Sequence, residues 1–302
     1  MWPPWGIRRA PLRPASRGTE WWTRSSRSIA TPWREDETLS PGTSWGLPPR
    51  VAIGDLLLDN LDLSQAVAAV ERAIAREARG YVVPMNVDLL LQYRESPAMR
   101  AACDGAALRV ADGMPIVWAA RLLGRPLPAR VAGADLVPAL CEMAAARGYT
   151  VFLLGGCTGV ADQAAGLLAA RFPGLRVAGT HTPPDRFAPD GTAALAAVRA
   201  VNASRPALLF VALGAPTQEL WVHRHWERLD ATVALCCGAA LDFAAGRRSR
   251  APIWLQRAGA EWAWRLAHEP GRLWRRYLVR DAAFMGIFLK EWWSARNRVC
   301  GK

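Results

Sequence analysis

From residue 51 to residue 245, short runs of apolar residues alternate with longer stretches rich in Ala, Leu and Arg. Uninterrupted apolar runs are typical of strands buried on both faces, as the strands of parallel sheets are. The pattern predicts strands at residues 81–83, 108–111, 150–154, 175–178, 207–213 and 232–237. The stretches between them, such as 134–147 and 159–171, are long enough for helices that connect parallel strands. The chain is therefore predicted to form an α/β fold, with a Rossmann-like, mostly parallel sheet flanked by helices.

The two ends of the chain differ from this central part in charge and in tryptophan content. Residues 1–50 carry 8 Arg, 4 acidic residues and 6 Trp, and residues 246–302 carry 13 Lys or Arg, 4 acidic residues and 6 Trp. The residues between them carry 17 basic and 18 acidic side chains and only 3 Trp. We therefore predict a disordered basic leader at 1–50, an α/β catalytic core at 51–245 and a basic, amphipathic helical appendage at 246–302.

The basic and aromatic ends indicate a partner with negative charge. Arg and Trp together suit an anionic membrane surface, although basic residues with aromatic ones also suit single-stranded nucleic acid. No run of about 18 apolar residues occurs, so we expect a protein that lies on a membrane rather than one that spans it. The six cysteines show no C-x-x-C spacing, which favours the reducing cytoplasm.

Within the appendage, one helix is expected to run to about residue 268 and another to begin near Gly271, because Pro270 disfavours helix before it.

Polar residues and glycines follow the predicted strands, at the edge of the sheet where α/β folds bind their ligands. Asp112 follows the second strand, and a carboxylate there could take a proton from a substrate hydroxyl. The alternative is that Asp112 caps the next helix, and Asn86 after the first strand is open to the same interpretation. Gly155 and Gly156 would let a nucleotide approach the backbone, or would serve only a tight turn.

Two motifs are missing from these strand ends, and their absence narrows the chemistry. No D-x-D motif, which often holds a divalent ion against a diphosphate, occurs, so we expect no metal site. Any diphosphate bound here would have to be met by arginines, helix N-termini or backbone amides. The glycine string after residue 154 reads G-G-x-x-G instead of G-x-G-x-x-G, which is weak support for a nicotinamide site. A Rossmann-type oxidoreductase and a basic nucleic-acid-binding protein are kept as alternatives.

Several strings from about residue 82 to residue 277 resemble the WecG/TagA/CpsF family of bacterial glycosyltransferases. They include ADGMP, then RVAGADL, and later LGAPTQELW and GAALDFAAG, in the family's order. The resemblance implies an inverting, metal-independent enzyme without a cofactor, which transfers a sugar from a UDP-sugar to an undecaprenyl-diphosphate-linked saccharide in cell-envelope or exopolysaccharide synthesis. The sugar would be N-acetylmannosamine, its uronic acid or a hexose. The enzyme would be peripheral on the inner face of the cytoplasmic membrane, with no nucleic-acid partner, and homo-oligomer formation is left open.

The resemblance also implies roles for individual residues. Asp112 matches the proposed base of the family, and Asn86 would position donor or acceptor hydroxyls. Substrate binding is expected from eight residues, the last three of them in the appendage: Arg130, Gly155, Gly156, Gln218, Asp242, Arg265, Arg272 and Arg275. A structural role is an equal alternative for Asp242, and a solvated basic face is the alternative for the arginines. The family commonly has a threonine where this chain has Pro84, so that threonine's role is not transferred and the donor sugar stays open.

Overall fold

The computed structural model describes residues 45–184 and 187–268, together with Gly271, Trp274, Phe284, Gly286 and Trp293. Its main sheet is formed by β3 (Gly80–Met85), β4 (Leu108–Ala111), β5 (Thr150–Gly155), β6 (Arg176–His181), β7 (Leu208–Ala212) and β8 (Val233–Cys236). The strand order is β4-β3-β8-β7-β5-β6, and every neighbouring pair is parallel. The predicted α/β fold with a parallel sheet is therefore confirmed, and each predicted strand overlaps one of these six.

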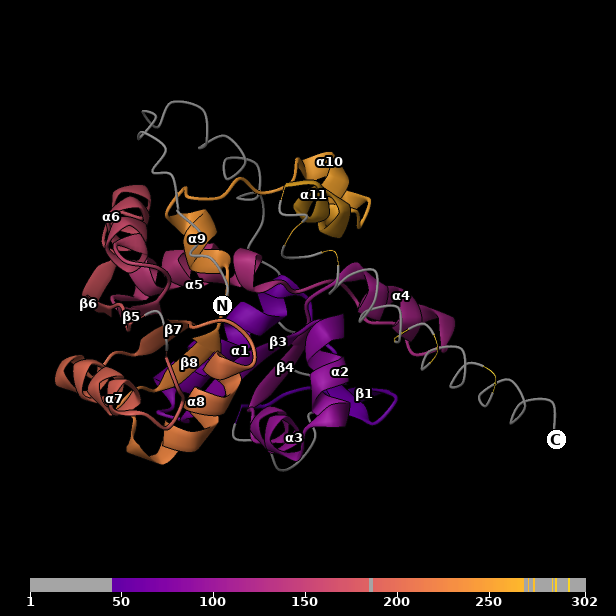
Figure 1. Ribbon diagram of the computed structural model, residues 1–302, viewed down its shortest axis with the longest axis horizontal. Coiled ribbons are helices and arrows are strands. Elements are labelled where there is room, and N and C mark those ends of the chain that lie inside the picture. Colours follow the sequence, from indigo (N-terminus) through magenta and orange to yellow (C-terminus); the bar gives the residue numbers. More distant parts are fainter. Residues whose placement is uncertain are drawn as a thin grey trace, which may run out of the picture.

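Helices lie on both sides of this sheet (Figure 1). One cluster of buried apolar residues is shared by α1 (Leu63–Ala75), α5 (Gly133–Arg147), α6 (Val160–Arg171) and α9 (Ala240–Ala244). A second cluster contains residues of α2 (Val87–Glu95), α3 (Pro97–Asp104), α4 (Met114–Leu122), α7 (Thr192–Ser204) and α8 (Thr217–His225), which a 3-10 helix at Trp226–Arg228 extends. Val82 of β3 belongs to the first cluster, whereas its neighbours Tyr81 and Val83 belong to the second. Successive side chains of a strand point to opposite faces, and both faces are covered, so the strand sequences are apolar throughout.

An antiparallel hairpin of β1 (Arg50–Ile53) and β2 (Leu56–Asp59) precedes the sheet and is not predicted from the sequence. Buried Asp59 joins it to β4, because the Asp59 carboxylate accepts a hydrogen bond from the Arg109 backbone N–H (2.7 Å) and pairs with Arg50 (2.8 Å). Strands of four residues with mixed burial carry too little pattern to be recognised. The hairpin lies beside β4, an edge strand of the sheet, and so shields part of its unpaired backbone.

The packed part of the chain begins before residue 51, where the predicted disordered leader was expected to end. Trp45 and Leu47 are each 2% exposed and belong to the first apolar cluster. Trp45 packs on Gly80, where a Cβ atom would lie 2.7 Å from the indole ring. The boundary at residue 51 is therefore corrected to a position no later than Trp45, and the rest of the leader, residues 1–44, lies outside the described residues.

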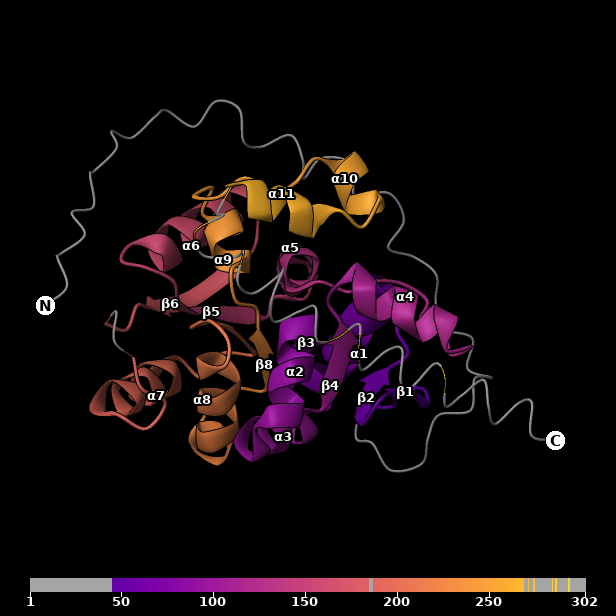
Figure 2. The ribbon, with the colours of Figure 1, turned by 45° about the vertical axis from the view of Figure 1, so that its right-hand side comes forward.

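The single helix expected up to about residue 268 is wrong. The structure has two short helices there, α10 (Ile253–Arg257) and α11 (Glu261–His268), which Figure 2 shows above the sheet. Gly259 separates them with a φ of +72°, a left-handed conformation that ends a helix and that glycine adopts without strain. The second expected helix, from about Gly271, lies largely outside the described residues. No helix in the described part of the chain is both long enough and apolar enough to cross a bilayer.

Candidate active site

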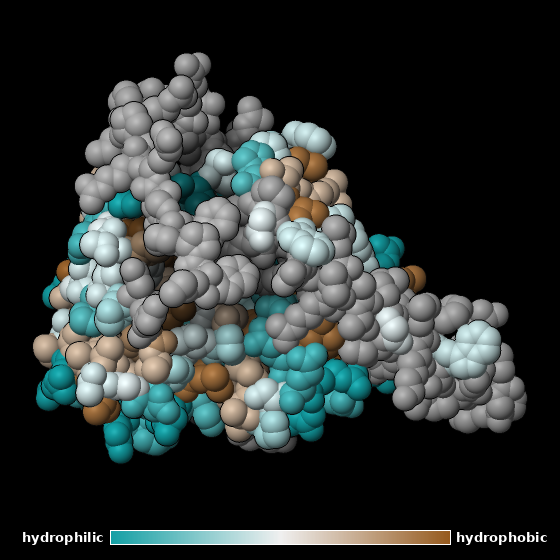
Figure 3. Space-filling model, in the orientation of Figure 1, coloured by the Kyte–Doolittle hydropathy of each residue, from teal (hydrophilic) through white to brown (hydrophobic). Residues whose placement is uncertain are grey.

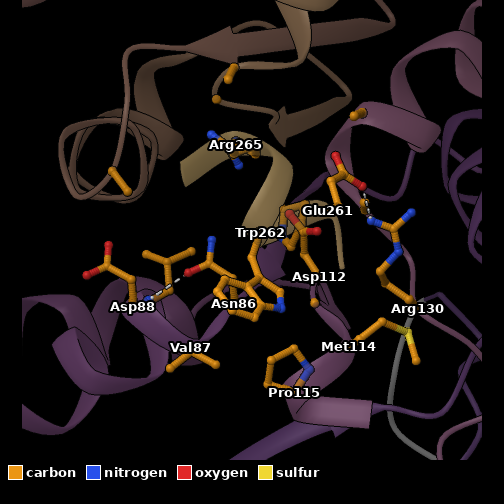
Figure 4. A pocket seen from close by; sticks show the side chains of 18 of the residues that line it. Asn86, Val87, Asp88, Asp112, Met114, Pro115, Arg130, Glu261, Trp262 and Arg265 are labelled. Carbon is orange, nitrogen blue, oxygen red and sulfur yellow. Dashed lines mark hydrogen bonds and ion pairs between the residues drawn. The ribbon is translucent and has the colours of Figure 1, made fainter. Parts of the chain in front are cut away.

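A cavity of about 700 Å³ lies at the carboxyl ends of four neighbouring strands, β4, β3, β8 and β7. Residues one or two positions after the ends of these strands line it, among them Asn86, Asp112, Gly214 and Gly238. Side chains of α4 and α11 form further walls, and Figure 4 shows Met114, Pro115, Glu261, Trp262 and Arg265 around Asp112. The ligand site that the sequence places at the strand ends coincides with this cavity.

Asp112 is held at the end of β4 by its backbone. Its N–H donates to the carbonyl of Met85 on the neighbouring strand, at 2.7 Å. The N-cap of α4 is Gly113, with a φ of +149°, and in the described structure no side chain caps this helix. The alternative that Asp112 serves as the helix cap is therefore wrong. Its carboxylate lies in the cavity wall instead, where it is available to a substrate.

The surroundings of Asp112 make its carboxyl group more basic than usual. Burial raises the pKa of Asp112 to about 6, an effect that Arg130 and Arg265 oppose and that Glu261 and Asp135 reinforce. A carboxyl group with this pKa is mostly ionised at neutral pH and still has appreciable affinity for a proton. These are the properties of an efficient general base near neutrality.

Four charged side chains form a network beside Asp112. The guanidinium group of Arg130 pairs with Glu261 through Nη1 (2.9 Å) and with Asp135 through Nη2 (3.0 Å). Arg250 contacts the same two carboxylates, Asp135 at 2.9 Å and Glu261 at 3.4 Å, and its side chain is only 2% exposed. Figure 4 shows the ion pair of Arg130 and Glu261 next to Asp112. Because Glu261 belongs to α11, the network fastens the C-terminal segment to the core.

Helix α11 also carries cavity residues of its own. Arg265 lies one helical turn after Glu261, and both line the cavity together with Trp262 (Figure 4). The structure therefore brings Arg130 and Arg265, which are far apart in the sequence, to the same cavity as Asp112. Arg272 and Arg275, the other two arginines expected from the appendage, lie outside the described residues.

Asn86 fulfils the capping role that was its alternative interpretation. It is the N-cap of α2, and its side-chain oxygen accepts a hydrogen bond from the Leu89 N–H (3.0 Å). It also lines the cavity, together with Pro84 two residues earlier. Pro84 is still in register with Val110 of β4, but pairing between β3 and β8 ends at Val82. The proline therefore lies beyond the part of β3 that pairs with β8, and its missing N–H costs no hydrogen bond there.

Gln218 lines the cavity from the first turn of α8, and two hydrogen bonds fix its amide. Its oxygen accepts from the Gly238 N–H (3.2 Å), and its nitrogen donates to Glu219 (2.7 Å). Glu219 is fully buried, which raises its pKa to about 7. The sequence interpretation overlooked Glu219. A signal was present, because Glu219 lies one helical turn before the apolar residue Val222 and therefore on the same side of the helix, which faces inward.

Three of the expected substrate-binding residues do not line the cavity. Gly155 is the last residue of β5 and Gly156 follows it, and β5 is separated from β8 by β7 in the sheet. Gly155 has a φ of +108° and lies directly against the backbone of Ala212, so the fold itself requires a glycine there. Asp242 pairs with Arg248 at 3.3 Å, in agreement with its structural alternative. Within the described residues, no group of three or more His, Cys, Asp or Glu side chains is placed to hold a metal ion.

A comparison with known proteins assigns the chain to a family. The model of the glycosyl transferase WecG/TagA/CpsF family matches residues 51–298. The chain belongs to the WecG/TagA/CpsF family. The prediction of a glycosyltransferase is therefore confirmed, and the match covers both the α/β core and the segment that contributes Glu261 and Arg265.

Curated relatives from two bacteria carry the same name, N-acetylglucosaminyldiphosphoundecaprenol N-acetyl-beta-D-mannosaminyltransferase. The protein of Bacillus spizizenii strain W23 is 28% identical over 242 residues, which are 80% of this chain and 91% of the relative. That of Staphylococcus aureus strain MW2 is 28% identical over 243 residues, again 80% of this chain and 91% of the relative. This member of the WecG/TagA/CpsF family is thus similar to these transferases over nearly their whole length.

Proposed function

We propose that this glycosyltransferase moves a sugar from a UDP-sugar to a saccharide carried on undecaprenyl diphosphate, with inversion at the anomeric carbon. The names of the relatives favour N-acetylmannosamine as the sugar and an N-acetylglucosaminyl-diphospholipid as the acceptor. The observation that carries the proposal is the position of Asp112, a carboxylate with a pKa of about 6 in the wall of a cavity that arginines also line.

In the proposed reaction, Asp112 takes the proton of the acceptor hydroxyl as its oxygen attacks the anomeric carbon of the donor. Attack comes from the face opposite UDP, so the bond between the anomeric carbon and the UDP oxygen breaks and inversion results. UDP leaves with the bonding electron pair. Asn86 and Gln218 line the same cavity and hold sugar or nucleotide groups. The Leu89 N–H fixes the Asn86 oxygen, and Gly238 and Glu219 fix the Gln218 amide.

The negative charge that develops on UDP is met by guanidinium groups in this proposal. Arg265 carries positive charge in the cavity wall, and Arg130 lines the same cavity, paired with Glu261 and Asp135. Guanidinium groups suit a diphosphate because their planar fork can donate two hydrogen bonds to one phosphate. The sequence has no D-x-D motif, which favours this metal-independent route. Arg272 and Arg275 of the appendage are proposed to join them.

A lipid-linked acceptor stays in the bilayer, so the enzyme must work at the membrane surface. We propose that residues 246–302 make this contact on the inner face of the cytoplasmic membrane, since they carry 13 basic residues and 6 Trp. Each basic residue near an anionic leaflet contributes about 1 kcal/mol to binding. A few of them are enough for reversible attachment. Gly155, Gly156 and Asp242 lie outside the cavity and have no part in the proposed reaction.

The proposal is tested by transfer assays with a panel of UDP-sugars and N-acetylglucosaminyl diphosphate on a short lipid. We expect UDP-N-acetylmannosamine to be used in the presence of EDTA and the product to have the inverted anomeric configuration. Asp112→Asn should abolish transfer and retain UDP binding. Transfer that requires a divalent ion would refute the arginine route, and full activity of the Asp112→Asn protein would refute the base.

A further inference from the structure

The cavity has an apolar arm that runs along α4, away from Asp112. Met114, Trp118 and Leu122 of this helix all line the cavity, and their spacing of four residues places them on one helix face. The distance along the helix from Met114 to Leu122 is about 12 Å, at about 1.5 Å per residue. The arm therefore starts beside the proposed reaction centre and ends well outside it.

The α4 face in this arm is distinct from the face that packs into the core. Ile116, Ala119 and Ala120 are buried, whereas Trp118 and Leu122 are 44% and 61% exposed. A helix that packs on only one side usually places polar residues on its opposite side. Large exposed apolar side chains next to a cavity are typical of binding surfaces.

The C-terminal segment forms the other side of the arm. Gly259, between α10 and α11, lies so close to α4 that a Cβ atom there would be 2.7 Å from Trp118 and 2.8 Å from Met114. Trp262 follows on α11, also lines the cavity, and is 44% exposed. Phe284 lines the cavity too and is buried. Figure 3 shows more apolar surface over α10, at the upper right, while the lower margin of this view is mostly hydrophilic.

We propose that this arm binds the first isoprenoid units of the lipid-linked acceptor, with the chain leaving the protein at Leu122. The inference rests on the proposed function, which places the acceptor saccharide next to Asp112. The diphosphate of such an acceptor lies between its sugar and its lipid chain, so an enzyme that binds it needs polar, cationic and apolar surfaces in that order. Asp112, the two arginines of the cavity wall and the arm supply these three surfaces within one cavity. Arg130 and Arg265 would then serve the diphosphates of UDP and of the acceptor between them. The UDP-sugar donor has no apolar chain that could occupy the arm.

The test compares Leu122→Gln with Leu167→Gln, a matched control. Leu167 is also an exposed leucine of a helix, at 45% exposure on α6, and does not line the cavity. The acceptors are N-acetylglucosaminyl diphosphate esterified to farnesol and the same diphosphate esterified to methanol, both in detergent-free solution. We expect Leu122→Gln to raise KM for the farnesyl acceptor about threefold to tenfold, the range for losing part of one apolar contact. KM for the methyl acceptor should stay unchanged, and the control protein should behave as the wild type with both.

A second measurement tests lipid binding in the arm independently of sugar transfer. Farnesyl diphosphate alone should bind the wild-type protein, and more weakly the Leu122→Gln protein, in a calorimetric titration. Binding of this kind without transfer to either acceptor would support the arm and refute the proposed function. Equal effects of Leu122→Gln on both acceptors, or on neither, would refute the arm. The arm would also be refuted if the Leu122→Gln protein bound acceptor-free anionic vesicles more weakly while its KM for the farnesyl acceptor was unchanged. The exposed face of α4 would then contact the bilayer surface and not the lipid chain of the acceptor.

Discussion

Glu261 on α11 lies 2.9 Å from Arg130, measured between Oε2 and Nη1, and this ion pair connects the C-terminal segment to the loop beside Asp112. The Glu261 side chain is 16% exposed, so water screens the pair only partly. Glu261 also raises the pKa of Asp112 through its negative charge. The same carboxylate therefore has two effects, one on the attachment of α11 and one on the basicity of the proposed base.

Replacing Glu261 by Gln should change both stability and pH dependence. Arg130 and Arg250 would lose their ion pairs with Glu261 and retain those with Asp135, so we expect a loss of about 1 to 3 kcal/mol in the free energy of unfolding. The pKa of Asp112 should fall below its value of about 6, because a neighbouring negative charge is removed. Denaturant titration and the pH dependence of kcat/KM measure the two effects. Glu227→Gln, at an exposed position outside the cavity, should change neither.

The raised pKa of Asp112 predicts an acid limb in the activity. kcat/KM should fall as the pH drops below about 6, where Asp112 becomes protonated and can no longer accept a proton. An activity that stayed constant from pH 7.5 to pH 5 would contradict the assignment of Asp112 as the base.

Asp112 should also destabilise the folded protein at neutral pH. Its carboxyl group ionises near pH 3.8 in the unfolded chain but only near pH 6 in the folded one, so the unfolded state releases its proton first as the pH rises. Stability is therefore lost across this window, and Asp112→Asn should recover about 2 to 3 kcal/mol at pH 7.5. Thermal unfolding at both ends of the window tests this. The gain should vanish near pH 3.5, and a variant less stable than the wild type at pH 7.5 would contradict it.

Gln218 should matter for donor binding and for the fold. Gln218→Leu removes the bond to the Gly238 N–H and leaves the buried Glu219 without its amide donor. We expect a rise of about tenfold in KM for the UDP-sugar and a loss of about 1 to 3 kcal/mol in stability. Gln163→Leu on α6, an exposed position outside the cavity, is the matched control. A KM that responds equally to both substitutions would argue against a role of Gln218 in the site.

Gly259 and Gly124 form a matched pair for the contact between α4 and the α10–α11 turn. Both have a φ of +72°, but a Cβ atom at Gly259 would collide with Trp118 and Met114, whereas one at Gly124 would meet nothing within 4 Å. Gly124→Ala should therefore cost about 1 kcal/mol, the backbone strain alone. Gly259→Ala should cost about 1 to 3 kcal/mol more, from overpacking, and should also lower transfer. Equal losses of stability in the two variants would show that the turn does not press on α4.

Much of this protein can be read from the amino-acid pattern. Apolar runs separated by helix-length stretches led to the parallel sheet, because burial on both faces leaves a local mark in each strand. The strand ends led to Asp112, since parallel strands place their carboxyl ends at one edge, whereas the family resemblance led to Gln218. Short elements leave weaker marks, so β1, β2 and the break at Gly259 were not predicted.

The composition of the site was decided by the order of the strands and by contacts between distant segments. The order β4-β3-β8-β7 brings the residues after these strands together and leaves Gly155, at the end of β5, outside the cavity. The charge network joins Arg130 and Asp135 to Arg250 and Glu261, more than a hundred residues later in the chain. Such pairing depends on which segments pack side by side, and hydrophobic periodicity along the chain holds no information about it. The buried Glu219 and the apolar arm of α4 became visible for the same reason, only once tertiary packing had enclosed one and left the other exposed.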